Sequence, residues 1–355
     1  MAGEFELISR HFTRPVKRAA LGVGDDCALL RVAPGQHLAV SSDMLVEGRH
    51  FLSTVAPERL GHKALAVNLS DLAACGAEPL AFTLALALPR VDDVWLGAFA
   101  RGLFALADSH GIELVGGDTT AGPLNICITA FGQVPTGAWP HARPHARPHA
   151  QPQDGQALQG QALQGQAPEG QAPQGQALLR SGAQVGDDLW VSGTLGDARL
   201  ALEVLRGSVA LAGDAFEQVR RAMEQPQPRV ALGLALRGLA HAAIDLSDGL
   251  LGDLGHVLQR SCVGAEVDVD ALPRSAVLAT QPLLLQQLCL LAGGDDYELL
   301  FTAAPARRAD VAVAARQAGV AATRCGVITA AAGLRVVDGA GRTVATPWRG
   351  FDHFA

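Results

Sequence analysis

Short apolar runs alternate with longer amphipathic segments along this chain of 355 residues. Runs bounded by glycine, proline or acidic residues predict strands, whereas apolar residues spaced three and four apart predict helices. In the first part of the chain, one predicted helix is 57–75, with Pro57 at its start, and another is 94–110, with Gly111 just past its end. The predicted strands there are 38–46, 82–88, 112–115 and 126–134.

The same alternation resumes at Arg180. Strands and helices that alternate in both parts are typical of a mixed α/β or α+β protein, and this length accommodates two lobes with cores of their own. The predicted strands of the second part are 189–192, 242–246, 265–269, 297–302 and 323–327. Its predicted helices are 197–205, 216–223, 229–240, 250–259 and 306–318.

A low-complexity segment separates the two alternating regions. It begins with His-Ala-Arg-Pro repeats and continues as near-copies of a Gly-Gln-Ala motif. From 141 to 179 it has no aromatic or β-branched residue, so it buries too little apolar area to offset its ordering entropy. We therefore expect an N-terminal lobe at 1–137, a disordered insert at 138–179 and a C-terminal lobe at 180–355.

Composition and charge argue against several classes of protein. The chain is 49% hydrophobic and 18% charged, and a formal net charge of −7 without a Lys/Arg-rich run argues against a nucleic-acid partner. The six cysteines form no Cys-x-x-Cys pair, which favours reduced thiols over zinc or redox use. Neither a secretion signal nor an apolar run of about 18 residues stands out, so we expect a cytoplasmic protein with no membrane partner.

Six short acidic clusters carry the candidate chemistry. Most follow a predicted strand, so we expect their carboxylates at strand ends or in the turns that follow. Carboxylates that converge in one cleft repel one another unless cations lie between them. Oxygen ligands without Cys or His favour Mg²⁺, and several Mg²⁺ ions are what a polyphosphate substrate requires. The clusters lie at 24–26, 41–43, 68–71, 116–119, 245–249 and 293–296.

The first three clusters each have a structural alternative to a metal role. We expect Asp25 to bond local backbone in a turn, and Asp26 to face the cleft. The cluster 41–43 offers hydroxyl, carbonyl and carboxylate ligands, although a plain turn at a strand end also accounts for it. Asn68 and Asp71 lie three apart on one face of the predicted helix, where a buried hydrogen bond is the alternative.

The later clusters combine glycines with carboxylates. Gly116 and Gly117 would let backbone N–H groups approach phosphate oxygens, with Asp118 holding a metal beside them, and a tight turn is the alternative. Asp245 and Asp248 lie three apart at a predicted helix start, where a simple N-cap needs only one of them.

Three further features leave two interpretations open. The cluster 293–296 could bind a substrate amine or cation as readily as Mg²⁺. The loop 192–197 has an anion-binding geometry, yet an ordinary strand–helix turn explains it equally well. His50 lies a few residues from the cluster 41–43, so a substrate contact and a structural role are both compatible with its position.

Common nucleotide-binding and nucleophile motifs are absent. The chain has no P-loop, no protein-kinase motif pair and no Gly-x-Ser-x-Gly elbow. No general base stands out beside the clusters, and an anionic phosphate acceptor would need none. Positioning and charge neutralisation could then carry phosphoryl transfer.

Taken together, these stretches resemble the thiamine-monophosphate kinase family, within the superfamily that includes aminoimidazole ribonucleotide synthetase. Examples are Ala-Val-Asn-Leu-Ser-Asp at 66–71 and Ile-Asp-Leu-Ser-Asp-Gly at 244–249. Any one match is weak, but all of them in this order are highly specific, and they span 3–354 apart from the insert. The matching stretches are 24–30, 42–51, 64–74, 116–119, 180–183, 244–250, 294–299 and 348–354.

This resemblance implies ATP-dependent phosphorylation of thiamine monophosphate to thiamine diphosphate. The γ-phosphoryl group would pass directly and in line between the substrates, with several Mg²⁺ ions as cofactors. The resemblance also implies a two-lobed synthetase-like fold and a homodimer whose N-terminal lobes pair their sheets. ATP would lie between the lobes.

The resemblance also assigns roles to the matching positions of this sequence. The implied catalytic residues are Asp43, Asp71 and Asp118. The implied Mg²⁺ ligands are Asp26, Ser41, Ser42, Asp43, Asp71, Asp118, Asp245 and Asp248. The implied ATP contacts are Gly117, Asp118, Arg180 and Ser247. The implied thiamine monophosphate contacts are His50, Asp295 and Phe351.

Two substrate-side positions depart from the family pattern, since Asp295 replaces a Glu of some relatives and Phe351 stands where a Tyr can occur. Both leave Mg·ATP binding intact. One alternative function is another ATP-dependent synthetase of the superfamily, such as an amidine-ring or selenophosphate synthetase. The latter would need a reactive Cys or Sec beside a Lys, and Cys27 is not adjacent to Lys17. The other alternative is a non-catalytic protein that binds a nucleotide or a metal.

Overall fold

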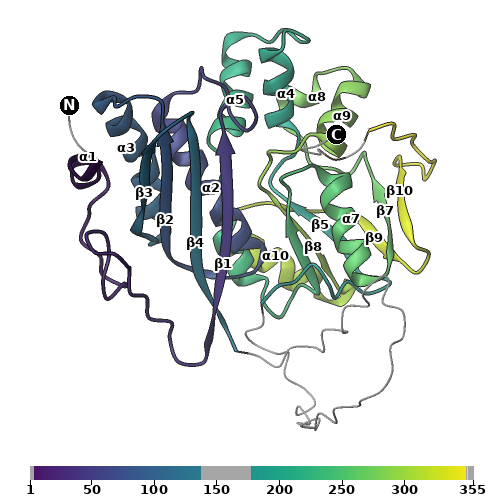
Figure 1. The fold of residues 1–355 in the computed structure, drawn as a ribbon. Coiled ribbons are helices and arrows are strands. Elements are labelled where there is room, and N and C mark those ends of the chain that lie inside the picture. The colour runs from purple at the N-terminus through teal and green to yellow at the C-terminus, as the bar shows by residue number, and fades with distance from the viewer. Residues whose placement is uncertain (1–3, 137–176, 349, 351–355) are drawn as a thin grey trace, which may run out of the picture.

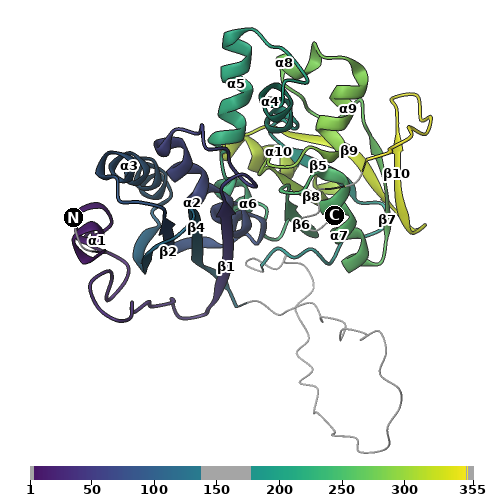
Figure 2. The same ribbon diagram turned by 45° about the horizontal axis from the view of Figure 1, so that its top comes forward.

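Two sheets with their helices lie side by side in the structure, a computed structural model that describes residues 4–136, 177–348 and 350 (Figure 1). Helix α2 (Pro57–Ala74) contacts elements of both lobes. Figure 2 shows the same ribbon after a 45° turn about the horizontal axis, and the two sheets again lie side by side. Phe351 and most of the predicted insert 138–179 lie outside the described residues.

The N-terminal sheet has the strand order β1-β4-β2-β3. Strand β4 pairs antiparallel with β1 and β2, and β3 pairs parallel with β2. The connection from β2 to β3 runs through α3 (Asp93–His110), as parallel neighbours require. Helix α1 (Glu4–His11) precedes the sheet. The strands are β1 (Gln36–Val46), β2 (Glu78–Leu88), β3 (Glu113–Ala121) and β4 (Asn125–Pro135).

The C-terminal sheet has the strand order β10-β7-β9-β5-β8-β6 and is mixed, with β10 parallel to β7 and the other pairs antiparallel. Its strands are β5 (Asp188–Ser192), β6 (Ala242–Asp245), β7 (Gly264–Asp268), β8 (Leu299–Ala303), β9 (Ala322–Thr329) and β10 (Gly333–Val337). Its helices are α4 (Asp197–Leu205), α5 (Gly213–Glu224), α6 (Val230–Ala235), α7 (Leu250–Ser261), α8 (Ala276–Ala279), α9 (Leu283–Ala292) and α10 (Arg308–Gln317), with a 3₁₀ turn at Pro305–Arg307.

The predicted mixed fold of strands and helices in two lobes is confirmed, and most predicted elements lie within a few residues of their observed bounds. Helices α1, α8 and α9 and strand β10 were not predicted. The predicted helix 229–240 is too long, because α6 ends at Ala235. The observed strand β8 begins at Leu299, later than the predicted strand 297–302, because Tyr297 has a positive φ of 52° that no strand accommodates.

The prediction that carboxylates lie at strand ends or in the turns that follow is wrong for the clusters 41–43 and 116–119, although the predicted strand 38–46 already contained the first of them. Strand β1 runs through Asp43, and β3 runs through Asp118. In β1, Ser41 and Asp43 are half-buried, whereas Ser42 between them is exposed. This alternation arises because successive side chains of a strand point to opposite faces of the sheet. These strands lie at the two edges of the sheet, where polar side chains need not interrupt a core.

Local signals set the ends of α3. The Asp92 side chain accepts hydrogen bonds from the backbone N–H groups of Val94 and Trp95, each over 3.0 Å. Such an N-cap satisfies donors that the first turn leaves free. The helix ends at His110, and the next residue, Gly111, has a φ of 61°, the left-handed conformation that glycine adopts without a Cβ clash.

The largest apolar cluster among the described residues includes residues of both lobes, with α2 at its centre, and a second cluster lies within the C-terminal lobe. Leu65 and Leu69 of α2, Phe82 of β2 and Phe301 of β8 belong to the largest cluster and are fully buried. Because α2 packs against both sheets, polar residues on it are held at the boundary between the lobes. That placement fixes the position of Asp71.

Two glycines bring α2 and α3 into backbone contact, and we expect Gly102→Ala to destabilise the fold by about 2–3 kcal/mol. A Cβ at Gly102 would overlap the carbonyl oxygen of Glu58, and one at Gly61 would overlap that of Phe99. The control is Gly97→Ala on the same helix, where the nearest atoms would lie 3.9 Å away. It should stabilise by about 0.5–1 kcal/mol. Urea denaturation measures both changes, and equal effects would contradict this packing.

Candidate active site at the lobe boundary

Carboxylates from both lobes meet at the boundary between them. Burial and the nearby Asp71 raise the pKa of Asp43 on β1 to about 7, with a smaller effect from Asp248. Burial, again followed by Asp71, raises the pKa of Asp245 on β6 to about 8. The structure therefore brings together four predicted ligands, two from each lobe: Asp43, Asp71, Asp245 and Asp248.

Hydrogen bonds from the N-terminal lobe orient this lobe-boundary cluster. The Ser41 hydroxyl donates to Asp71, and the Ser70 hydroxyl donates to Asp245 across the boundary over 2.8 Å. Asn68 is fully buried, accepts a hydrogen bond from the backbone N–H of Asp43 over 3.2 Å and donates to a carbonyl of its own helix. Asn68 therefore makes the buried hydrogen bonds that were the alternative to a metal role, and Asp71 is the residue of this pair that faces the cluster.

Asp253 is a residue of this site that the sequence analysis missed. Its carboxylate accepts the backbone N–H groups of Ser247 and Asp248, each over 3.1 Å. Burial and the nearby Asp248 raise its pKa to about 7. The only available signal was a third acidic residue shortly after the Asp-Leu-Ser-Asp-Gly motif, in an otherwise apolar helix start.

A pocket of about 390 Å³ opens beside the cluster. It is lined from the N-terminal lobe by Ser41 and Asp71, and from the C-terminal lobe by Asp245 and Arg180. The pKa of Asp71 is raised by burial, while the Ser41 hydrogen bond and the positive charge of Arg180 oppose that rise. A cationic side chain beside the carboxylates of this pocket suits the binding of a phosphate chain together with its cations.

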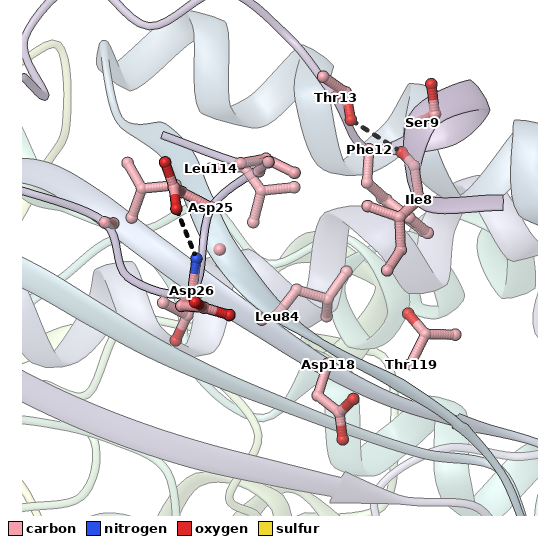
Figure 3. Close-up of a pocket in the computed structure, with 17 residues that line it drawn as sticks. Ile8, Ser9, Phe12, Thr13, Asp25, Asp26, Leu84, Leu114, Asp118 and Thr119 are labelled. Carbon is pink, nitrogen blue, oxygen red and sulfur yellow. Dashed lines mark hydrogen bonds between the residues drawn. The ribbon is translucent and has the colours of Figure 1, made fainter. Parts of the chain in front are cut away.

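The remaining predicted ligands lie elsewhere. Asp26 and Asp118 line a second pocket of about 640 Å³, together with Asp25 (Figure 3). The backbone N–H of Asp26 donates to Asp25 over 3.2 Å, which is the local turn expected for Asp25. Since Asp43 and Asp118 lie on opposite edges of a four-stranded sheet, roughly 14 Å of strand spacing separates them.

Two predicted residues have clear structural reasons for their identity. A Cβ at Gly117 would overlap the backbone of Leu84 in the neighbouring strand, and Gly117 has a φ of 147° that favours glycine. The Ser42 hydroxyl lies 2.9 Å from the Thr129 hydroxyl and donates to the Ile128 carbonyl over 3.3 Å. The structure therefore presents Ser42 on the face of the sheet opposite to Ser41 and Asp43.

The donor set fits Mg²⁺ bound together with a phosphate ligand. Among residues 4–136, 177–348 and 350, no three His, Cys, Asp or Glu side chains are arranged to hold a metal ion by themselves. The lobe-boundary cluster nevertheless has oxygen donors only, and the raised pKa values of Asp43 and Asp245 reflect carboxylates that a cation would stabilise. Mg²⁺ commonly takes one or two carboxylates, with phosphate oxygens and water as its other ligands.

A third, smaller pocket of about 80 Å³ contains two predicted substrate contacts, His50 and Asp295. The imidazole Nδ1 of His50 accepts a hydrogen bond from the backbone N–H of Val46 over 3.0 Å, which places its ring proton on Nε2. The Asp295 carboxylate accepts a hydrogen bond from the Lys63 ammonium over 2.5 Å. Phe351, the third predicted contact, lies outside the described residues.

The neighbouring Asp296 is half-buried and has a different role. It accepts the backbone N–H of Gly196 over 2.9 Å, and burial raises its pKa well above the usual range. A Cβ at Gly193 in the same loop would overlap the Glu298 carboxylate. Protein carboxylates thus occupy the loop 192–197, which agrees with an ordinary turn rather than an anion site.

Comparison with known proteins decides the family. The chain matches the family model of AIR synthase related protein, N-terminal domain, over residues 24–134, and that of the C-terminal domain over residues 184–339. It is 43% identical to the thiamine-monophosphate kinase of Salmonella typhimurium and 42% identical to that of Escherichia coli K12, over 99% of this chain and 98% of each relative. The chain belongs to the thiamine-monophosphate kinase family.

Solved thiamine-monophosphate kinases share this fold. That of Stenotrophomonas maltophilia K279a superposes with a TM-score of 0.77 at 42% identity, covering 95% of each chain. AaThiL, solved in complex with AMPPCP and TMP, superposes with a TM-score of 0.70 at 26% identity, covering 91% of this chain and 89% of that one. The resemblance stated from the sequence motifs is therefore confirmed.

A solved protein of lower sequence identity shares the fold alone. HypE of E. coli, a hydrogenase maturation protein, superposes with a TM-score of 0.68 at 21% identity. At this identity the likeness concerns the fold and carries no inference about function. No helix in the described part of the chain combines the length and apolarity that a membrane span would need.

Proposed function

We propose that this chain catalyses ATP-dependent phosphorylation of thiamine monophosphate to thiamine diphosphate, with several Mg²⁺ ions. The observation that carries the proposal is the meeting of Asp43 and Asp71 from one lobe with Asp245 and Asp248 from the other. Sequence relatives named thiamine-monophosphate kinase, and one solved with AMPPCP and TMP, support the choice of substrates. Because ATP and the thiamine phosphates are cytoplasmic metabolites, the proposal includes a cytoplasmic location.

The lobe-boundary cluster would hold Mg²⁺ through Ser41 and its four carboxylates, and Arg180 and Ser247 would contact ATP. Mg²⁺ held by these residues would supply positive charge that offsets the charge of the phosphate chain. Asp253 fixes the backbone of Ser247 and Asp248, so the C-terminal donors are preorganised. Catalysis then rests on positioning and on electrostatic stabilisation of the transferring group.

The second pocket belongs to the same proposal. Asp26 and Asp118 would hold Mg²⁺ there, with Gly117 against the phosphate chain. By the strand register, Ser42 lies on the same face of the sheet as Asp118, although it does not line this pocket. Within one chain, this pocket and the lobe-boundary cluster lie apart. For both to act on one ATP, the nucleotide, its cations or a second subunit must span the distance between them. The two-lobe division, 1–137 and 180–355 around the insert, is likewise part of the proposal.

The acceptor would bind in the small pocket with His50 and Asp295. Asp295 donates its backbone N–H to the carbonyl oxygen of Ser247 over 2.8 Å, so the acceptor pocket and the nucleotide loop are directly linked. The acceptor is a phosphate oxygen that is already anionic, which explains why the site offers no general base. Phe351 would complete the acceptor site.

The test is direct. Purified protein is mixed with ATP, Mg²⁺ and thiamine monophosphate, and the products are separated by chromatography. We expect thiamine diphosphate and ADP in equal amounts. Binding of ATP without turnover would favour the non-catalytic alternative, and ATP consumption with a different acceptor would favour another synthetase of the superfamily.

We also propose a homodimer that pairs the N-terminal sheets through β1. This strand is a sheet edge within the described residues, and its exposed face carries Leu38, Val40 and Met44, the last two each 57% exposed. An apolar, unpaired edge strand is a natural pairing surface.

Val40→Arg is expected to convert the dimer to a monomer, because it would bury an unpaired charge in that interface. Light scattering after size-exclusion chromatography measures the mass. The matched control is Val94→Arg on α3, where the side chain is 84% exposed and away from β1. A dimer that persists in Val40→Arg would contradict pairing through this edge.

A further inference from the structure

Lys63 is among the largest fully buried side chains of the described residues. Burying an ammonium ion costs several kcal/mol unless an anion replaces its water. Its Nζ donates to Asp295 Oδ2 over 2.5 Å. This ion pair joins α2 of the N-terminal lobe to the loop 293–297 of the C-terminal lobe.

The loop fixes Asp295 in an unusual conformation. Asp295 has a φ of 64° and the preceding Gly294 a φ of 70°. A non-glycine residue in this region costs about 1 kcal/mol, and Asp tolerates it better than most. The backbone N–H groups of Asp295 and Tyr297 donate to the carbonyl oxygens of Ser247 and Leu246, each over 2.8 Å. With its backbone anchored and Oδ2 bonded to Lys63, the Asp295 carboxylate is held in one orientation.

The two partners are exposed to very different degrees. The Asp295 side chain is 35% exposed, whereas that of Lys63 is 3% exposed. Both line the 80 Å³ pocket that also contains His50. A ligand in this pocket therefore meets the carboxylate, while the ammonium group supports it from behind.

We propose that Lys63 is a positioning residue for thiamine monophosphate, acting through Asp295. The amino group of thiamine donates hydrogen bonds and its thiazolium ring is positively charged, so a fixed carboxylate suits both. Lys63 sets the orientation of that carboxylate and takes no part in phosphoryl transfer. This inference rests on the proposed function, because it requires thiamine monophosphate to be the ligand of the pocket.

Lys63→Met tests the proposal, because methionine has a similar length and no charge. We expect the KM for thiamine monophosphate to rise about tenfold or more, which corresponds to about 1.4 kcal/mol. The KM for ATP should stay within about twofold and kcat within about threefold, since only uniform substrate binding is lost. Lys63→Arg keeps the cation and should recover part of the affinity.

A double-mutant cycle shows whether Lys63 acts through Asp295. In an Asp295→Asn background, Lys63→Met should change the KM for thiamine monophosphate by less than about twofold. The matched control is Arg59→Met, also on α2, which removes ion pairs to Glu217 and Glu224 across the same boundary. Glu224 keeps Arg220 as a partner over 2.8 Å, so this variant should leave that KM within about twofold.

Three results would overturn the inference. They are an unchanged KM in Lys63→Met, an equal rise in Arg59→Met, and full additivity of Lys63→Met with Asp295→Asn. If Lys63→Met does not fold, Lys63→Gln is tested in its place with the same expected split, and calorimetric titration of thiamine monophosphate replaces kinetics. Failure of the wild-type protein to form thiamine diphosphate would instead overturn the proposed function, so the two outcomes are distinguishable.

Discussion

Replacement of Asp71 by asparagine is expected to lower kcat by about 100-fold or more while the fold survives. Asp71 accepts the Ser41 hydroxyl and lies close enough to Asp43 and Asp245 to raise their pKa values, after burial. The amide oxygen of asparagine can keep the hydrogen bond to Ser41. The main loss is therefore one negative charge, which would otherwise help to hold Mg²⁺ against the phosphate chain.

The same loss of kcat is expected for Asp43→Asn and Asp118→Asn. Steady-state kinetics give kcat, and thermal melting confirms that each variant is folded. The control is Asp108→Asn on α3, where an exposed carboxylate pairs with Arg14 over 3.1 Å and should not affect turnover. Turnover at the wild-type rate in all three site variants would contradict the proposed site. Wild-type turnover in Asp118→Asn alone would remove the second pocket from it.

Asp245→Asn is expected to stabilise the metal-free protein at high pH, by about 2 kcal/mol at pH 9. Burial and neighbouring carboxylates raise the pKa of Asp245 to about 8 and that of Asp43 to about 7. Both values exceed those of the unfolded chain, so the folded protein binds more protons between about pH 4 and pH 8. The free energy of unfolding therefore falls as pH rises through this window.

Urea denaturation in EDTA at pH 5, 7 and 9 measures this effect. The stability advantage of Asp245→Asn should grow from pH 5 to pH 9, and asparagine can still accept the Ser70 hydroxyl. Adding Mg²⁺ with an ATP analogue should stabilise the wild type at pH 9 and stabilise the variant much less. The surface variant Asp108→Asn should follow the wild-type curve. If Asp245→Asn were less stable than the wild type at pH 9, the burial and mutual repulsion of these carboxylates would not destabilise the folded protein, which would contradict this prediction.

The sequence predicted the two-lobed fold because its signals were local and strong. The apolar period of α2 and α3, Pro57 at one helix start and Gly111 after a helix end all have direct counterparts in the structure. The acidic motifs pointed to the four carboxylates that meet at the lobe boundary, but they also placed Asp26 and Asp118 there, and the structure puts these two in a separate pocket. Asp71 and Asp245, far apart in the chain, lie together because α2 packs against both sheets.

What the sequence did not show depends on tertiary packing. Periodicity could not tell that β3 continues through its acidic cluster, since Gly and Asp are poor strand formers. Nothing local separates Asp295, which lines a pocket, from Asp296, which accepts a hydrogen bond from the backbone N–H of Gly196. Asp253 was missed for the same reason, because its importance comes from two backbone N–H groups that only the fold brings to it.

The central claim is that carboxylates of both lobes hold divalent cations around the phosphate chain of ATP. A crystal structure with Mn²⁺ and a non-hydrolysable ATP analogue tests it most directly, because anomalous scattering locates the metal. We predict Mn²⁺ at about 2 Å from carboxylate oxygens of both lobes, at Asp43 or Asp71 and at Asp245 or Asp248. A bound nucleotide whose metal ions contact neither pair would contradict the account.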